Sequence, residues 1–445
     1  MYLHQIELEN IKGFRGRHLL NLQLSHGGYA GWTVFAGRNG AGKSTLLKAV
    51  ALAVSGPLRA HTLMGGFAYW VRKEQGVGRV LVELVHESGQ DRFVGGSGKS
   101  PKGYVDVALK WTTNAKGTDA LERDETRSTG AARQSVDRGP WNDSPQGWFL
   151  AAYGPYRHLG PSTPEVVRMA QVPELARVVN LFSESATLSE AVEWLRELHL
   201  RALEKRDGAA AQRDGILRLL NDGLLPDGSE VRRVDADGLW IFRDGVEMPL
   251  DQVSDGYRTV AALVTDILRR LYDAYGSLTL RDSADGHVCC DLPGVVLIDE
   301  VDSHLHVSWQ QRIGTWLTRH FPRIQFLVTT HSPFICQSAS PGGLVRLPAP
   351  GEERQLEKVS EDTWRSVVNG GADAAVLTDL FGLEHAHSPA SEKLRQDIAG
   401  LEVKVIRESA TSDEVAHYNH LKSMLSASLS ERADRKLRAV VANGG

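Results

Sequence analysis

The chain has 445 residues, of which 42% are hydrophobic and 24% are charged. This composition is typical of a folded globular protein with room for more than one lobe. The net charge of −4 argues against a protein that binds nucleic acid over much of its surface, because phosphate binding requires a local excess of Lys and Arg. Three Cys exclude a disulfide framework. We see no secretory signal and no apolar stretch of membrane-spanning length, so we expect a cytoplasmic protein without a membrane partner.

The N-terminal region contains a phosphate-binding motif. Residues 1–24 alternate and turn at Lys12-Gly13-Phe14-Arg15, which predicts two strands. The apolar run 32–36 predicts a third strand, and a helical pattern covers residues 44–54. Between them lies the P-loop spacing G-x-x-x-x-G-K-[ST], formed by Gly37, Arg38, Asn39, Gly40, Ala41, Gly42, Lys43, Ser44 and Thr45. Strand, loop and helix in this order predict a nucleotide site.

The residue types of the P-loop suit the binding of a nucleoside triphosphate. Glycines allow the backbone to approach the phosphates, and the N–H groups at the helix start point at them. Lys43 is predicted to reach the β- and γ-phosphates of ATP, and Ser44 to ligate Mg²⁺. Arg15, close to the loop in sequence, is either a nucleotide contact or a solvated cation of the turn.

The middle of the chain alternates between strand, loop and helix patterns. Two alternating runs within 77–112 predict antiparallel strands, and the polar stretch 113–147 predicts an irregular loop. Residues 148–153 form an apolar strand pattern. A helical period over 164–225 predicts a helical lobe, and residues 230–250 predict a hairpin with its turn at Asp244-Gly245.

The C-terminal half alternates between helical and apolar strand patterns. We expect helices over 254–275 and 309–320, a loop over 276–292, and strands over 295–298 and 324–329. Short apolar strands separated by helices indicate a parallel α/β sheet. A last strand is expected over 342–347, and helices from Trp364 onward. The expected divisions are 1–160, 161–228, 229–350 and 364–445.

Three further clusters contain residues suited to metal binding, catalysis or phosphate binding. A buried strand ends in Asp299 and Glu300, which places Asp299 to hold Mg²⁺ through water and Glu300 to polarise a water at the γ-phosphate. His331 follows the next apolar strand, where a γ-phosphate sensor would lie. Ser254 precedes a helix as a good N-cap, and such a helix start binds anions. Ser-Asp-Gly also forms ordinary turns, so this third cluster is weak on local grounds.

The four stretches, in this order, resemble the ABC-type ATPases of the RecF/SMC/OLD group. Ser254-Asp255-Gly256-Tyr257-Arg258 matches the signature motif of that group, with Asp255 in place of its first Gly. Asp302 matches the D-loop and His331 the switch histidine. The resemblance implies an ABC-type P-loop head: a mixed β-sheet with flanking helices, an antiparallel β subdomain, a helical insert and a helical C-terminal region. The Q-loop glutamine has no match, because the corresponding strand end reads Tyr153-Gly154-Pro155-Tyr156-Arg157.

A narrower resemblance concerns the segment that begins at Asp299. It reads D-E-V-D-S-H-L-H, followed by Trp309-Gln310-Gln311, and is similar to the compact PtuA-type ATPase subunits of Septu and related retron anti-phage systems. That resemblance implies hydrolysis of ATP with Mg²⁺, a homodimer with ATP sandwiched between the P-loop of one copy and the signature of the other, and a separate nuclease subunit. An HNH nuclease is expected and a Toprim nuclease is the alternative. Higher oligomers, and contact with DNA through the complex, stay open.

Other function classes are less well supported. A self-contained OLD-like nuclease would need a Toprim domain, for which residues 364–445 lack length and strands. The absence of a long coiled coil disfavours an SMC protein, whereas a RecF-like DNA-repair ATPase remains the alternative. The N-terminal turn 12–15 speaks against a membrane-transporter subunit. A metal site at His304 and His306 is disfavoured because no third ligand lies near them in sequence.

Overall fold

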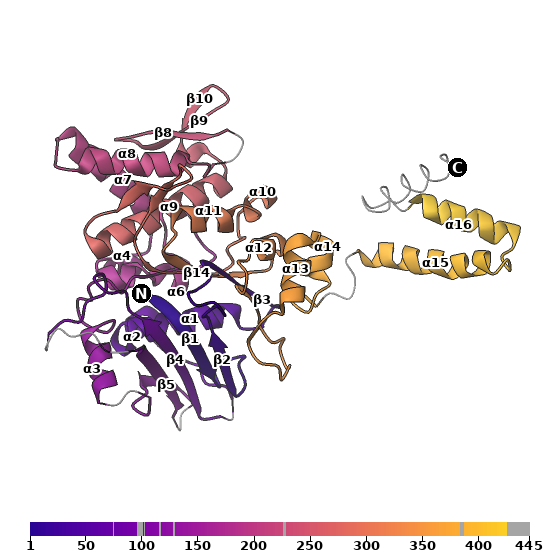
Figure 1. The fold of residues 1–445 in the computed structure, drawn as a ribbon, viewed down its shortest axis with the longest axis horizontal. Helices are drawn as coiled ribbons and strands as arrows, with labels where there is room; N and C mark the ends of the chain where they lie inside the picture. The colour runs from indigo at the N-terminus through magenta and orange to yellow at the C-terminus, as the bar shows by residue number, and fades with distance from the viewer. Residues whose placement is uncertain are drawn as a thin grey trace. The chain divides into compact units, whose positions relative to one another are not determined.

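The computed structural model describes residues 1–73, 75–95, 101, 103–114, 117–127, 130–225, 228–382 and 387–424. They belong to two compact units, Met1–Gly382 and Leu383–Gly445. The first unit contains three sheets of three or more strands, with helices around them (Figure 1).

The central sheet of the first unit is mainly parallel. Its strand order is β16-β15-β3-β14-β13-β7, and only β16 runs antiparallel to its neighbour. The four inner positions β15, β3, β14 and β13 are buried along their whole length, which is why they read as continuous apolar runs. The strands are β3 (Trp32–Ala36), β7 (Leu150–Tyr153), β13 (Gly294–Ile298), β14 (Ile324–Thr330), β15 (Leu344–Arg346) and β16 (Glu357–Lys358).

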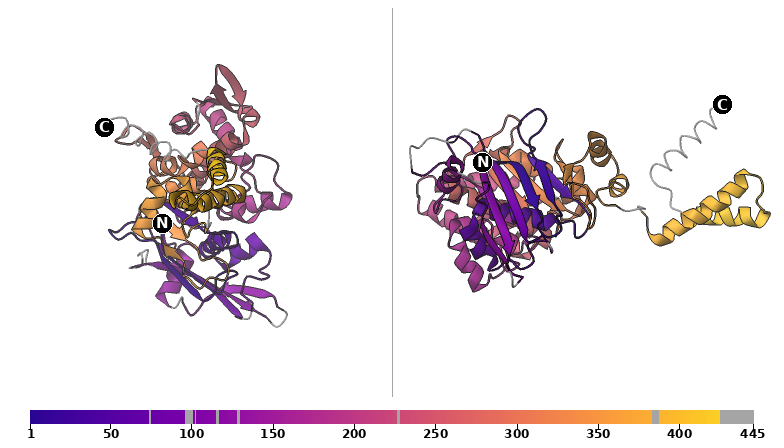
Figure 2. Two further views of the ribbon diagram at one scale, coloured as in Figure 1. Left: turned by 90° about the vertical axis from the view of Figure 1, so that its right-hand side faces the viewer. Right: turned by 90° about the horizontal axis from the view of Figure 1, so that it is seen from below.

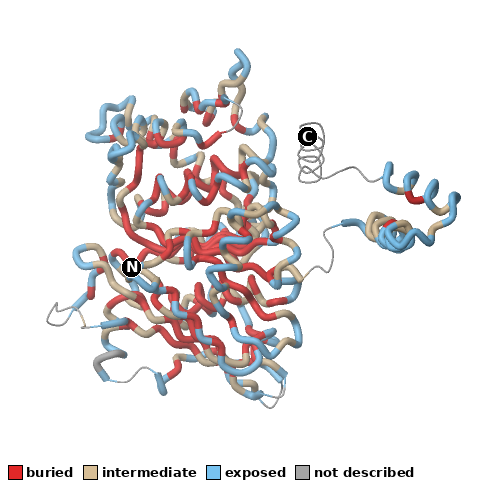
Figure 3. The backbone as a smooth tube through the Cα atoms, turned by 45° about the vertical axis from the view of Figure 1, so that its right-hand side comes forward, coloured by how far each residue is buried: buried red, intermediate tan, exposed pale blue. Residues whose placement is uncertain are grey.

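Alternate side chains of this sheet enter two different cores. On β13, Val295 and Leu297 pack into the core that includes helix α1 (Lys43–Ser55), whereas Val296 and Ile298 pack into the core that includes α9 (Asp255–Tyr275). The two-residue period of a strand produces this division. Buried backbone therefore runs through the middle of the unit in Figure 3. The predicted parallel α/β sheet is confirmed.

A five-stranded antiparallel sheet covers the side of the unit that contains α1. Its order is β2-β1-β4-β5-β6, and its strands lie side by side in the second view of Figure 2. The prediction for residues 113–147 was wrong in part, because this stretch contains edge strand β6 and helix α3. The elements are β1 (Tyr2–Glu9), β2 (Arg17–Asn21), β4 (Val77–Val85), β5 (Val105–Thr113), β6 (Asp119–Arg123), α2 (Pro57–Met64) and α3 (Ala131–Arg138).

A helical insert follows β7, as predicted, and leads into a three-stranded sheet in the upper part of Figure 1. The turn between β9 and β10 is formed by Asp244 and Gly245, both at positive φ, as the predicted hairpin requires. The elements are α4 (Pro164–Ala170), α5 (Pro173–Ala176), α6 (Val179–Phe182), α7 (Ser189–Leu203), α8 (Ala209–Asn221), β8 (Glu230–Asp235), β9 (Gly238–Arg243), β10 (Val246–Pro249) and the 3-10 turn Leu250–Gln252.

The C-terminal half of the first unit departs from the predictions at two places. Residues 276–292, expected as a loop, contain the hairpin β11 (Leu280–Asp282) and β12 (Val288–Cys290). The helix expected over 309–320 is divided into α10 (Val307–Gln310) and α11 (Ile313–His320). The remaining helices of this unit are α12 (Pro333–Gln337), α13 (Glu361–Asn369) and α14 (Ala372–Val376).

The second unit contains α15 (Pro389–Ile406) and α16 (Ser412–Met424). Most of its described residues are exposed, and only Ile398 and Tyr418 are buried. The part of the predicted C-terminal helical region at residues 383–386 and 425–445 lies outside the described residues. No helix among the described residues has the length and apolarity needed to cross a membrane.

Candidate functional site

The P-loop occupies the turn between β3 and α1. Gly40 and Gly42 adopt positive φ angles of 78° and 91°, which glycine reaches without a steric cost. A side chain at Gly42 would also collide with Phe14, since an added Cβ would lie 2.8 Å from its ring. The turn at residues 10–16 therefore packs directly against the loop and fixes its path.

Lys43 lies folded back over this loop. Its Nζ donates to the carbonyl oxygens of Gly37 (2.9 Å) and Arg38 (3.2 Å). Burial lowers the pKa of Lys43, while the negative charges of nearby carboxylates raise it; these carboxylates are Asp299, Glu300 and Asp302. The ammonium group thus lies between the loop and the acids that follow β13. Ser44 and Thr45 are partly exposed in the first turn of α1.

Two arginines near the loop have protein partners. Arg38 donates from Nη2 to the carbonyl oxygen of Gly382 at 2.6 Å. Arg15 lies 3.8 Å from Glu353, and both side chains are largely exposed. Its part in nucleotide binding stays a prediction.

The end of β13 presents the two predicted acids in different settings. Asp299 is 3% exposed, and its Oδ1 accepts from Thr329 Oγ1 at 2.5 Å. The same Oγ1 accepts from the backbone N–H of Glu300 at 2.8 Å. Glu300 itself has a φ of 46°, a left-handed conformation that is uncommon for a residue with a side chain. One threonine of β14 therefore holds both predicted acids.

Thr330, at the end of β14, makes the corresponding bonds to Asp302 and Ser332. Thr330 Oγ1 donates to Asp302 at 2.5 Å and accepts from the backbone N–H of Ser332 at 2.8 Å. His331 lies between these two residues and is exposed. Partial burial lowers the pKa of His331, and the positive charge of Lys43 lowers it further. Because β14 pairs in parallel with β3, with Thr330 opposite Ala36, His331 follows its strand at the same edge of the sheet as the P-loop.

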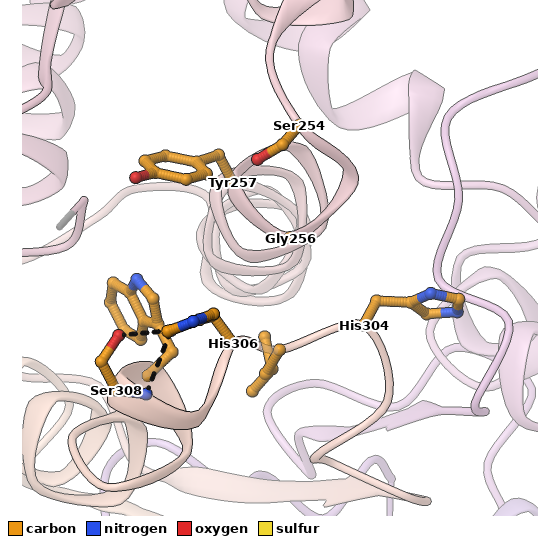
Figure 4. Close-up of a pocket in the computed structure, with 8 residues that line it drawn as sticks. Ser254, Gly256, Tyr257, His304, His306 and Ser308 are labelled. Carbon is orange, nitrogen blue, oxygen red and sulfur yellow. Dashed lines mark hydrogen bonds between the residues drawn. The ribbon is translucent and has the colours of Figure 1, made fainter. Parts of the chain in front are cut away.

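The predicted signature turn lies against the far end of the turn that follows the acids, where an added Cβ on Gly256 would lie 2.8 Å from the carbonyl oxygen of His304. Ser254 is the N-cap residue of α9, but its hydroxyl makes no capping hydrogen bond. Asp255 and Arg258 form an ion pair with each other. The start of α9 instead lines a pocket of about 430 Å³ with the turn at residues 304–309 (Figure 4). In that view Ser254 and Tyr257 lie on one side of the pocket, and His306 and Ser308 on the other.

His304 and His306 do not converge on one point in this pocket. Figure 4 shows the two imidazoles directed apart, and His306 Nδ1 lies 3.0 Å from Ser308 Oγ. Among the described residues, the group that comes closest to a metal-ligand set is Asp222, His287 and His320, which lie just after α8, just before β12 and at the end of α11. His320 Nδ1 lies 2.6 Å from the carbonyl oxygen of Val288, which makes this nitrogen a donor and leaves the buried Nε2 as the nitrogen that could accept or ligate. Two members of the group also bond to each other, with His287 Nδ1 lying 2.9 Å from Asp222 Oδ1.

Sequence reasoning missed Arg157, which lies directly beneath the acids. The residue is 2% exposed, and its guanidinium donates to the carbonyl oxygens of Asp299 (2.8 Å) and Glu300 (2.9 Å). The only sequence signal was its place after the strand Leu150–Tyr153, where the ABC-type pattern carries the Q-loop glutamine.

Comparison with known proteins gives two family matches. Residues 5–139 match the model described as "AAA domain", and residues 162–337 match the model described as "AAA domain, putative AbiEii toxin, Type IV TA system". The matched ranges include the P-loop in one case, and the signature turn, both acids and His331 in the other.

Curated relatives point the same way. The Septu protein PtuA of Bacillus mycoides (strain KBAB4) is 26% identical over 80% of this chain and 41% of its own length. The Retron Ec83 probable ATPase of Escherichia coli is 32% identical over 51% of this chain and 40% of its own. The chain is related to the Septu and retron ATPases. The P-loop of this chain lies within one of the two matched AAA domains.

A third relative and one solved structure complete the comparison. The Retron Vc95 probable ATPase of Vibrio cholerae serotype O1 biovar El Tor is 38% identical over 24% of this chain and 20% of its own length. This chain thus spans well under half the length of the relatives it matches. An SMC head bound to the C-terminal winged-helix domain of ScpA superposes with a TM-score of 0.48 and 14% identity, over 81% of this chain and 98% of that chain.

Proposed function

We propose that this protein is the ATP-hydrolysing subunit of an anti-phage defence complex, in which ATP binding joins two copies head to head and thereby controls an associated nuclease. The observation that carries this proposal is the division of the site. The P-loop, the two acids and His331 follow neighbouring parallel strands at one edge of the sheet, whereas the exposed signature turn lines a pocket whose lining residues include none of them. The second half of the nucleotide site is then supplied by another copy.

The residues of the first half suit binding and hydrolysis of ATP. The P-loop amides and Lys43 bind the phosphates. Glu300 accepts a proton from the attacking water, and His331 contacts the γ-phosphate. The hydroxyl of Ser44 and the carboxylate of Asp299 are hard oxygen ligands of the kind Mg²⁺ prefers, and Mg²⁺ would neutralise phosphate charge there. Three further residues would assist nucleotide binding at the margin of the loop: Arg38, Asn39 and Arg15.

The second half is formed by Ser254, Asp255 and Gly256 of the partner copy, with Asp302 of the first copy at the junction. A helix start offers N–H groups and a positive dipole end to the γ-phosphate. Two nucleotides buried between two copies link ATP concentration to assembly by mass action. Hydrolysis opens the assembly, and the change of shape reaches the nuclease.

The association with defence rests on the relatives of this chain, Septu PtuA and the retron ATPases. We propose a separate HNH nuclease as the partner, with a Toprim nuclease as the alternative. Contact with DNA occurs through the complex, and the working place is the cytoplasm.

Glu300→Gln tests the proposal. The amide cannot accept the proton, so hydrolysis falls by about 100-fold or more while the ATP Kd changes by less than about 3-fold. Light scattering with and without ATP measures the mass of the particle. We expect the dimer of Glu300→Gln to persist after ATP addition for longer than the wild-type dimer does. Glu361→Gln, at an exposed carboxylate in the first turn of α13, is the matched control and should hydrolyse ATP normally.

Two outcomes would contradict the proposal. Hydrolysis at the normal rate by Glu300→Gln would remove Glu300 as the base. A particle mass that ATP does not change would remove the shared site. ATP-dependent binding of DNA by this chain alone, without a copurifying nuclease, would favour a RecF-like DNA-repair ATPase instead.

A further inference from the structure

Arg157 is a buried cation whose guanidinium donates to four carbonyl oxygens of one turn, residues 299–303, and to one of its own strand end. Besides its bonds to Asp299 and Glu300, it donates to the carbonyl oxygens of Gly154 (2.6 Å), Val301 (3.4 Å) and Ser303 (3.3 Å). Burial lowers the pKa of Arg157 to about 10, while the nearby carboxylates raise it, so the group remains charged at neutral pH. The planar fork of a guanidinium is suited to bind several acceptors at once.

The turn that Arg157 holds is not a relaxed one. Glu300 and His304 adopt φ angles of 46° and 65°, which residues with side chains seldom occupy. Such conformations persist where the surroundings determine them, and they cluster at functional sites. Arg157 on one side and Thr329 on the other fix the backbone of Glu300 through its carbonyl oxygen and its N–H.

The backbone of Arg157 is joined to the signature helix. Thr259 Oγ1, in the first two turns of α9, donates to the carbonyl oxygen of Arg157 at 3.2 Å. The same strand end is tied to α9 again, because Tyr153 Oη donates to Asp266 Oδ2 at 2.9 Å. At the start of α9, an added Cβ on Gly256 would lie 2.8 Å from the carbonyl oxygen of His304. Helix α9 therefore contacts the strand end at Arg157 through Thr259, and the turn at His304 through Gly256.

We propose that Arg157 is a positioning residue for hydrolysis: it fixes the backbone that carries Glu300 and, through Thr259, makes the position of Glu300 respond to a nucleotide docked against α9. The proposal rests on the proposed function, in which Glu300 polarises the attacking water and α9 meets the nucleotide of a second copy. Arg157 occupies the strand end where a Q-loop glutamine is expected, and it acts on the protein backbone instead of on metal or water.

Arg157→Lys tests this assignment. Lysine keeps the charge but offers its donors from one point, so it cannot span the carbonyl groups of residues 299–303. We expect kcat to fall by about 30-fold and the ATP Kd to change by less than about 3-fold, because Arg157 bonds to no P-loop atom. A purely structural defect would lower ATP binding and kcat together.

Thr259→Val removes the link to α9 with little change in shape. We expect kcat to fall by about 5-fold and the rise of specific activity with protein concentration to weaken. Because both residues act through one link, the double variant should be about as slow as Arg157→Lys alone. Should Arg157→Lys fail to fold, as judged by circular dichroism, Thr259→Val carries the test by itself.

Arg177→Lys is the matched control. Arg177 is also a buried arginine beside β7, but its guanidinium lies 5.9 Å from the ring of Phe149, at the opposite end of the strand. Its kcat should stay within about 2-fold of the wild type. The proposal is overturned if Arg157→Lys and Thr259→Val both keep the wild-type kcat, or if Arg177→Lys loses as much activity as Arg157→Lys. Loss of hydrolysis in Glu300→Gln alongside normal Arg157 and Thr259 variants would leave the proposed function intact and overturn only this inference.

Discussion

The two halves of the proposed nucleotide site are built differently. The half that contains the P-loop is made of strand ends, with Asp299 buried and Thr329 bonded to both acids. The half that contains the signature turn is an exposed helix start whose N-cap hydroxyl makes no capping bond. The first half is thus organised by bonds within the protein, whereas the second is an exposed surface that we propose meets another copy. Binding of ATP and its hydrolysis should therefore be separable by substitution.

Lys43→Ala breaks the first half and should have the largest effect on binding. The substitution removes a charged donor to the phosphates, worth about 3 kcal/mol, and so weakens ATP binding by about 100-fold. Titration calorimetry on the single chain measures it. Lys48→Ala, on the same helix, is the control; an equal loss there would mean that charge near the loop, and not the bond from Lys43, matters.

Ser254→Asp breaks only the second half. Asp is as good an N-cap as Ser and favours the helix dipole, so the fold should be unchanged. The new charge would face the γ-phosphate of the partner copy, and we expect hydrolysis and ATP-dependent assembly to fall by about 30-fold with ATP affinity of the single chain intact. Rates measured across protein concentrations give this result.

Ser360→Asp provides the comparison for that variant. Ser360 is an exposed N-cap residue of α13, where its side chain accepts from the N–H of Thr363. It should assemble and hydrolyse ATP as the wild type does. Equal behaviour of the Ser254 and Ser360 variants would refute the shared site.

The contrast between the halves also explains what could be read from the sequence. The predicted site residues are local patterns at the ends of apolar strands: Gly37–Thr45, Asp299-Glu300 and His331. The burial of those strands and the grouping of the residues that follow them come from the parallel sheet. The role of Arg157 depends on a contact with Asp299 across 142 residues, which no local pattern records. Strand β6 and helix α3 escaped prediction because one is a short edge strand and the other has a single described buried apolar residue, Val136.

Thr329→Val sharpens the comparison within the first half. Valine has the shape of threonine, but it leaves the Glu300 N–H and an Asp299 oxygen without their partner. We expect a loss of about 2 kcal/mol in the free energy of unfolding and a fall in kcat of about 10-fold. Urea denaturation and steady-state kinetics measure the two effects. Thr318→Val, at a partly exposed helical threonine of α11, should change neither by as much.

Arg15→Ala should have the smallest effect, because this residue lies at the exposed margin of the first half. Its guanidinium is 70% exposed and 3.8 Å from Glu353, so an electrostatic contribution to nucleotide binding is screened by water and salt. We expect ATP affinity to fall by about 3-fold at low salt and the difference to vanish near 0.5 M salt, where the Debye length is only about 4 Å. A loss of 10-fold or more that persists at high salt would mean that Arg15 bonds directly to the nucleotide, and that the organised half of the site extends to the turn at residues 10–16.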